Sequence, residues 1–233
     1  MLGTMFYLSQ RSMRNATVDE LVNNLTHPDG YVRGDATEEL IRRRDPSGVP
    51  LLVQLMEYPE EGVRWNVARI LGEAGDAQAA EALIVALEDP SALVAKQAAA
   101  ALGMLKISSA ADGLIRALGH DESIARNTSA WALGELKSEK AVPFLTAALG
   151  DDIGMVRASA AEALGKIGDS KAVDSLLLLP DDPFPDVRLN VAWALGELRD
   201  KRASGVLAVL AKDSDMTVRR LAGEALKKLE GLP

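Results

Sequence analysis

Hydrophobic and polar residues along the chain follow a pattern that repeats every 31 residues. An arginine marks the pattern in six periods, and we call its position the rung. Hydrophobic residues stand one position before the rung and three, four, seven and ten positions after it, which is one face of a helix with 3.6 residues per turn. Each period therefore predicts one amphipathic helix around its rung. The rungs are Arg33, Arg64, Arg126, Arg157, Arg188 and Arg219, with Ala95 in the remaining place.

Two leucine columns keep the same register as the rungs. One column lies seven residues after each rung and comprises Leu40, Leu71, Leu102, Leu133, Leu164, Leu195 and Leu226. The other lies nineteen residues after and comprises Leu52, Leu83, Leu114, Leu145, Leu176 and Leu207, with Leu21 one period earlier. The second column belongs to a second apolar stripe at helical spacing, as in residues 141–149. Each period therefore predicts two helices.

Turn residues separate the two predicted helices of each period. Gly75 and Gly168 stand where a helix can end in the left-handed conformation. Aspartates follow at the place where a side chain can cap the next helix, namely Asp45, Asp76, Asp169 and Asp200. A helical hairpin of this size cannot bury its apolar side alone, so stacking on neighbouring hairpins is expected.

The pattern predicts an all-α fold, an α-α superhelix or solenoid of about seven 31-residue helical hairpins. We expect residues 17–233 to form a single solenoid domain and residues 1–16 to be an N-terminal cap or a flexible segment. No run of about 18 apolar residues is present, so no membrane span is predicted. The chain also lacks cysteine and a secretory signal pattern, which favours a cytoplasmic protein.

Charge and residue chemistry narrow the function classes. The net charge of −8 opposes binding to nucleic acid or to anionic membranes. The two histidines, His27 and His120, lie in turns where other repeats carry aspartate. No cluster of metal ligands, Gly-rich phosphate loop or nucleophile–base motif is recognisable. We therefore predict no metal, no cofactor and no catalytic residues, hence no enzyme.

The segment from Asp152 to Leu176 carries the clearest family resemblance. Its residues V-R-x-x-A-x-x-A-L-G-x-I-G-D-x-x-A-V-x-x-L, from Val156 onward, resemble the HEAT-like repeats first grouped with phycobilin lyases. The resemblance extends over residues 17–231. It implies a scaffold or adaptor, with a phycobilin lyase or tetrapyrrole chaperone subunit as the alternative. The iron-binding His-Glu pairs of the hydroxylase branch are missing, because Pro28 follows His27 and Asp121 follows His120.

The resemblance also implies roles for the rung helix. Its arginines resemble an internal clamp that pairs with aspartates at the turns, and a guanidinium fork suits such carboxylates. A ligand-binding stripe of arginines stays open as an alternative. In the family the rung helix lines the concave surface, so its outward positions are expected to line a groove.

The outward positions of the rung helices here are rich in Trp, Met, Leu and Asn, a composition typical of protein-binding patches. We predict that another protein or a peptide binds them in the concave groove. A tryptophan there could instead pack over the neighbouring repeat, and the stripe could instead form a homodimer surface. The candidate residues are Trp65, Asn66, Arg69, Leu93, Ile124, Asn127, Trp131, Met155, Leu189, Asn190 and Trp193.

Overall fold

The computed structural model describes residues 13–75 and 77–231, and every regular element among them is a helix. These residues gather into two compact units, which meet in the sequence between Ile107 and Ser108. The first unit contains α2 to α7 and the second contains α8 to α15. We describe each unit by itself. The prediction of one domain over residues 17–233 stays a prediction.

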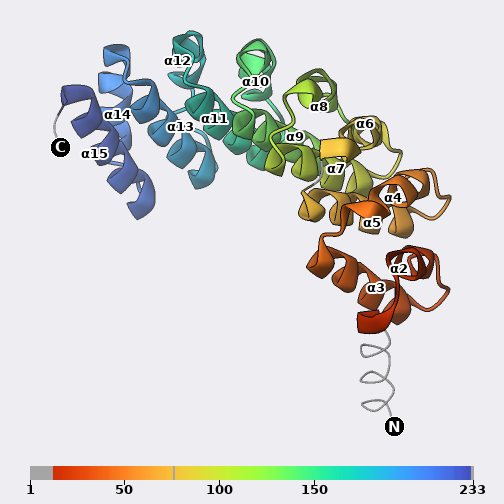
Figure 1. The fold of residues 1–233 in the computed structure, drawn as a ribbon. Coiled ribbons are helices and arrows are strands. Elements are labelled where there is room, and N and C mark those ends of the chain that lie inside the picture. The colour runs from red at the N-terminus through yellow and green to blue at the C-terminus, as the bar shows by residue number, and fades with distance from the viewer. Residues whose placement is uncertain (1–12, 76, 232–233) are drawn as a thin grey trace. The chain divides into compact units, whose positions relative to one another are not determined.

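Three pairs of α-helices form the first unit. The helices that carry the rungs, which we call rung helices, pack side by side as α3, α5 and α7, and the shorter α2, α4 and α6 pack against them (Figure 1). The elements are α2 (Val18–Asn24), α3 (Gly30–Arg43), η1 (Pro46–Gly48), α4 (Val49–Leu55), α5 (Glu61–Ala74), η2 (Ala77–Ala79), α6 (Ala80–Val85), η3 (Ala86–Glu88) and α7 (Ala92–Met104).

Four pairs of α-helices form the second unit. Rung helices α9, α11, α13 and α15 pack in sequence order, and each short helix packs against the rung helix that follows it. The elements are η4 (Ser108–Ala110), α8 (Ala111–Ala117), α9 (Ser123–Glu135), η5 (Glu139–Ala141), α10 (Val142–Ala148), α11 (Gly154–Ile167), η6 (Ser170–Ala172), α12 (Val173–Leu176), α13 (Pro185–Leu198), η7 (Lys201–Ala203), α14 (Ser204–Leu210) and α15 (Met216–Glu230). The described residues thus form seven hairpins, as predicted, each a short helix followed by a rung helix.

The described end of the predicted N-terminal cap is fixed to the first rung helix. Arg43 in α3 donates to the carbonyl oxygen of Met13 at 2.8 Å and to that of Ala16 at 2.7 Å. Buried Glu39 accepts from the Arg43 Nε at 2.7 Å and so holds the guanidinium in place. Residues 13–16 therefore pack on the first hairpin, whereas residues 1–12 lie outside the described part of the chain.

The two leucine columns form the core of both units. All thirteen leucines of these columns other than Leu226 are at most 4% exposed, and Leu226 in the last rung helix is half-buried. Burial of each such side chain contributes roughly 1.5–3 kcal/mol relative to exposure. The predicted inward face of the repeat is therefore confirmed.

A column of glycines eight residues after the rungs allows the rung helices to approach closely. A Cβ atom added at Gly134 in α9 would lie 2.8 Å from the Cα atom of Ala163 in α11. One added at Gly165 would lie 2.8 Å from the Cα atom of Ala194 in α13. Because backbone atoms cannot yield at such distances, only glycine fits. The close packing of the rung helices therefore depends on this glycine column.

The predicted helix ends are present where their residues are described. Gly75 and Gly168 end α5 and α11 with φ angles of 83° and 79°, in the left-handed region. At the same place, Arg44, Lys106, Lys137 and Arg199 adopt φ angles between 49° and 52°. The carboxylates of Asp45, Asp169 and Asp200 accept from the backbone amide two residues on and so cap the following 3-10 helices. Asp76 lies outside the described residues.

One buried side chain in the second unit is unsatisfied. The hydroxyl of Ser129 in α9 is buried and has no hydrogen-bond partner. The same column holds alanine in other rung helices, for example Ala160 in α11. Because an unpaired buried hydroxyl costs about 1 kcal/mol or more, Ser129→Ala should raise the free energy of unfolding by about 1 kcal/mol. Urea unfolding of the two proteins measures the change, and a less stable variant would contradict it.

Candidate interaction surface

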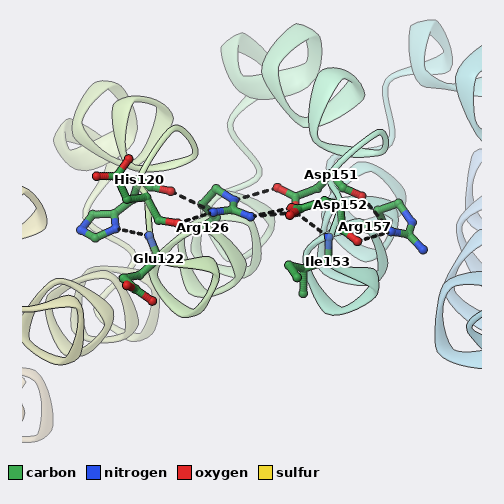
Figure 2. Close-up of polar contacts among 8 residues, drawn as sticks. His120, Glu122, Arg126, Asp151, Asp152, Ile153 and Arg157 are labelled. Carbon is green, nitrogen blue, oxygen red and sulfur yellow. Dashed lines mark hydrogen bonds and ion pairs between the residues drawn. The ribbon is translucent and has the colours of Figure 1, made fainter.

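Rung arginines join successive repeats through carboxylates of the next turn. In the second unit, Arg157 of α11 donates from Nε to Asp182 at 2.7 Å and from Nη2 to the same carboxylate at 3.0 Å. Its Nη1 donates to the carbonyl oxygens of Asp151 and Asp152 in the preceding turn. The guanidinium therefore ties the turn before its helix to the turn before the next rung helix. Figure 2 shows Arg126 in the same arrangement between its two turns.

The aspartate of each clamp stands 25 residues after its arginine. The pairs are Arg64–Asp89, Arg126–Asp151, Arg157–Asp182 and Arg188–Asp213, each bidentate with Nε to carboxylate distances of 2.7 Å. The turn aspartates twelve residues after the rung, Asp45, Asp76, Asp169 and Asp200, are the other possible partners in the sequence. Where described, these cap 3-10 helices instead. The clamp is therefore a contact between repeats.

Two rung arginines differ from this pattern. Arg33 donates to the carbonyl oxygens of His27 and Pro28 and lies 3.6 Å from Glu60, because Tyr58 stands in the aspartate position. Arg219 donates to the carbonyl oxygens of Asp213 and Ser214.

At position 95 the guanidinium is replaced by the Ala95 methyl group, and the position 25 residues later holds His120. The Nδ1 atom of His120 accepts from the Glu122 amide at 2.9 Å, as Asp151 Oδ1 accepts from the Ile153 amide (Figure 2). His120 therefore closes the same turn as the clamp aspartates do, but it supplies no carboxylate for an arginine.

The clamps lower the pKa of their carboxyl groups. Hydrogen bonds from Arg126 and from the Ile153 amide hold the pKa of Asp151 at about 2. Hydrogen bonds from Arg188 and from the Asp215 amide do the same for Asp213, also to about 2. Burial is the largest influence on Asp182 and raises its pKa, but its bonds from Arg157 and the Phe184 amide outweigh that effect and lower it.

These shifts predict that the second unit loses stability in acid. An unfolded aspartate has a pKa of about 3.9, above the folded values, so the clamps stabilise the fold fully above about pH 5 and progressively less as the pH falls toward 2. We expect the urea midpoint to fall across this range. Asp213→Asn, measured in parallel, should reduce the fall, and a midpoint independent of pH would contradict the prediction.

Two candidate residues of the first unit, Trp65 and Arg69, contact each other. The guanidinium of Arg69 lies 6.0 Å from the ring centroid of Trp65, within the range of a cation–π contact. Arg69 also donates to Glu38 of α3 at 2.8 Å and to Glu73 of its own helix at 3.0 Å. Trp65, Asn66 and Arg69 are all half-buried. Trp65 therefore packs within a network that joins α3 and α5 while part of its side chain stays accessible.

Two candidate asparagines of the second unit bridge neighbouring rung helices. Asn127 in α9 accepts from the Ser159 hydroxyl of α11 at 2.7 Å. Asn190 in α13 donates to the carbonyl oxygen of Ala158 in α11 at 3.0 Å. Both amides already have partners within the protein, so they contribute to helix packing.

The candidate tryptophans of the second unit are half-buried, as is Leu189. The ring of Trp193 in α13 packs against α11, where a Cβ atom added at Gly165 would lie 2.6 Å from its Cζ3 atom. Trp131 in α9 has an intermediate exposure as well. None of the three indoles is sealed inside its unit, and none is fully exposed. Whether Trp65, in the first unit, shares a groove with the other two stays a prediction.

Most of the large exposed apolar side chains of the rung helices lie at or beside their N-terminal ends. Candidate residues Ile124 and Met155 are 37% and 63% exposed at equivalent places in α9 and α11. In the first unit, Leu93 of α7 occupies the same column and is 52% exposed. The N-caps Ile153 and Phe184 of α11 and α13 are exposed too, although they are not among the residues predicted from the sequence. We call Ile124, Ile153, Met155 and Phe184 the apolar row.

The clamp explains why apolar residues are tolerated at these N-caps. Asp182 accepts from the Phe184 amide at 2.9 Å, so the turn is closed without a polar side chain at position 184. The Phe184 ring then lies against Gly154 and over the Arg157 guanidinium, 5.5 Å from ring centroid to Cζ. Half of the ring remains accessible. Apolar residues in the N-cap column, where other repeats have Asp29 or Glu60, were the sequence feature that could have revealed them.

Exposed carboxylates stand close to the residues of the apolar row in the sequence. Near the N-terminal ends of these rung helices, which we call the edge, the guanidinium groups of Arg126, Arg157 and Arg188 are already paired with their clamp aspartates. Within a few residues of the row along the sequence, the exposed charged side chains are all acidic, namely Asp121, Glu122, Asp152, Asp181 and Asp186. Asp152 pairs with Arg126 at 3.0 Å and is still 81% exposed. The edge therefore combines apolar contact area with unbalanced negative charge.

The described residues contain no group of three or more His, Asp or Glu side chains that could hold a metal ion. Within the same ranges, no helix is long and apolar enough to cross a membrane.

Helix pairs at a fixed 31-residue period, tied by arginine–aspartate clamps, define this chain as a helical repeat protein. The family model described as HEAT repeats matches residues 18–103, 80–154, 111–181 and 176–233, so the chain belongs to the HEAT-repeat family. Comparison with curated protein sequences gives no match.

Solved structures share the fold at low sequence identity. An archaeal HEAT-like repeats protein from Thermococcus onnurineus NA1 matches with a TM-score of 0.66 and 14% identity over 93% of this chain and 98% of that one. The complex of CpcE and CpcF of phycocyanin lyase from Nostoc sp. PCC7120 gives a TM-score of 0.58 and 22% identity over 92% and 95%. An engineered protein matches with a TM-score of 0.65 and 23% identity over 91% of this chain and 68% of that one. At these identities the similarity is one of fold.

Proposed function

We propose that this protein is a non-catalytic interaction scaffold or adaptor that binds another protein or a peptide through the exposed side of its rung helices. The supporting observation is the repetition of large exposed apolar side chains, including Leu93, Ile124 and Met155, in one column of the rung helices. Isolated exposed apolar residues are common, but regular rows of them mark interaction sites. The acidic composition supports a protein partner over nucleic acid.

Photo-crosslinking from single positions tests the proposal. A photoreactive phenylalanine analogue is placed at Met155 on a rung helix, at Leu93 on another, and at Leu178 as control. Leu178 is 81% exposed and follows short helix α12. We expect the same partner protein to be crosslinked in cells from positions 155 and 93 and not from position 178. Crosslinks only between copies of this chain would show a homodimer, and no rung-helix adduct would refute the proposal.

The alternative suggested by the sequence, a phycobilin lyase or tetrapyrrole chaperone subunit, stays a prediction. The similarity to the phycocyanin lyase complex supports it only through the shared fold. Mixing the protein with phycocyanobilin and recording the absorption spectrum tests it directly, since a bound bilin should shift its absorption band. An unchanged spectrum would remove this alternative.

A further inference from the structure

We infer that the apolar row of the second unit binds a basic, apolar segment of a partner protein. This inference rests on the proposed scaffold function and specifies the partner's chemistry. The row spans three consecutive rung helices, from Ile124 in α9 through Ile153 and Met155 in α11 to Phe184 at the start of α13. Equivalent residues on stacked helices repeat at the helix spacing of about 8–10 Å, so the row is about 20 Å long.

The length of the row fits a short peptide segment. About 13 residues of helix, at a rise of 1.5 Å per residue, match 20 Å. An extended strand would need about six residues at 3.3 Å each. In both cases the segment would place several apolar side chains on Ile124, Met155 and Phe184, in the manner of known peptide–helix recognition.

The charge of the edge selects a basic segment. Asp121, Glu122, Asp181 and Asp186 are exposed, and the nearby guanidiniums are already neutralised by the clamps. A partner carrying Asp or Glu would meet like charge, which disfavours association, whereas Lys or Arg would meet unpaired carboxylates. These carboxylates also interact favourably with the positive N-terminal end of the helix dipole. Because their side chains are exposed, they can still pair with Lys or Arg of a partner.

The apolar row differs from another exposed apolar surface of the second unit. Phe144 on short helix α10 is 50% exposed, close to the 52% of Phe184. It borders a shallow apolar hollow with Ile115, Leu118 and Ala147. Arg116 and Asp151, which carry opposite charges, also line that hollow, so it favours neither a basic nor an acidic occupant and serves as a matched control.

Synthetic peptides test the inference on the full-length protein. Three 16-residue peptides share the same Leu and Phe positions at helical spacing and carry Lys, Gln or Glu at the remaining positions. Fluorescence polarisation measures the dissociation constant of each. We expect the Lys peptide to bind at least about tenfold more tightly than the Glu peptide, and the difference to shrink at high salt as the charges are screened.

Single substitutions in the apolar row and at control positions locate the peptide-binding site. Phe184→Ser and Met155→Ser should each weaken the Lys peptide by about tenfold, the size expected for an anchor residue, while Phe144→Ser should leave it within about twofold. Met155→Ser is included because Phe184 also packs on Arg157, and circular dichroism checks that each variant is folded. For charge, Asp186→Lys should weaken the Lys peptide, and Asp174→Lys on short helix α12 should not.

The outcomes separate this inference from the proposed function. If the Glu peptide binds as tightly as the Lys peptide, and Met155→Ser weakens both, the rung helices bind peptides but the inference about partner chemistry is wrong. If Phe144→Ser weakens binding as much as Phe184→Ser, the location is wrong. If the Lys peptide does not bind at concentrations up to about 1 mM, the inference is overturned. The crosslinking experiment, which makes no assumption about charge, then decides the proposed function alone.

Discussion

Leu164→Ala should lower the free energy of unfolding by about 2–5 kcal/mol. Leu164 lies in the middle of α11, is fully buried and belongs to the leucine column seven residues after the rungs. Its neighbours cannot collapse into the space that the truncation leaves. Gly165, the next residue, already brings the α11 and α13 backbones as close as van der Waals contact allows. The cost should therefore include a cavity as well as lost burial, and urea unfolding followed by circular dichroism measures it.

The control for this prediction is the same substitution at an exposed leucine. Leu178→Ala removes the same atoms from a side chain that is 81% exposed, so the change should stay within about 0.5 kcal/mol. Similar losses in the two variants would show that the repeat does not bury its leucine column as described.

The fold could be predicted from the sequence because the same hydrophobic pattern occurs in seven successive periods. A leucine at a fixed place in every period, buried in all of them except at Leu226, fixes the helix face and its register without reference to distant residues. The glycine column was harder to interpret. Gly134 and Gly165 look like helix breakers in a single helix, and only the distance to the next rung helix shows that a methyl group would not fit there.

The candidate surface was predicted less completely, for two physical reasons. Exposed and half-buried residues alternate within the outward stripe, so the sequence selected Asn127 and Asn190 although each bonds to a neighbouring helix. It also missed Phe184, because an apolar residue at a helix N-terminus is usually unfavourable. At that position Asp182 accepts from the Phe184 amide and fixes the turn, a contact that depends on the clamp between repeats.

Asp182→Ala should destabilise the second unit by about 3 kcal/mol, because it breaks a buried ion pair and leaves one charge without its partner. Arg157 and Asp182 are each 8% exposed, and the Phe184 ring shields the guanidinium. Without the carboxylate, Arg157 would keep its carbonyl contacts in the preceding turn and its contact with the Phe184 ring, but it would have no bidentate partner. The Phe184 amide would also lose its acceptor, which should loosen the N-terminus of α13. Hydrogen exchange of amides near residue 184, together with urea unfolding, measures both effects.

Asp174→Ala is the matched control, because it breaks an Asp–Arg pair at the surface. Asp174 is 77% exposed and pairs with the half-exposed Arg202, which retains a second carboxylate at Asp200. Water solvates both charges when such a pair breaks, so little stability should be lost. A large loss for Asp182→Ala and little for Asp174→Ala would show that burial gives the clamp its strength. Equal losses would mean that the rung arginines do not stabilise the contact between α11 and α13. Since the same turn holds Phe184 in the apolar row, Asp182→Ala should also weaken any peptide bound there.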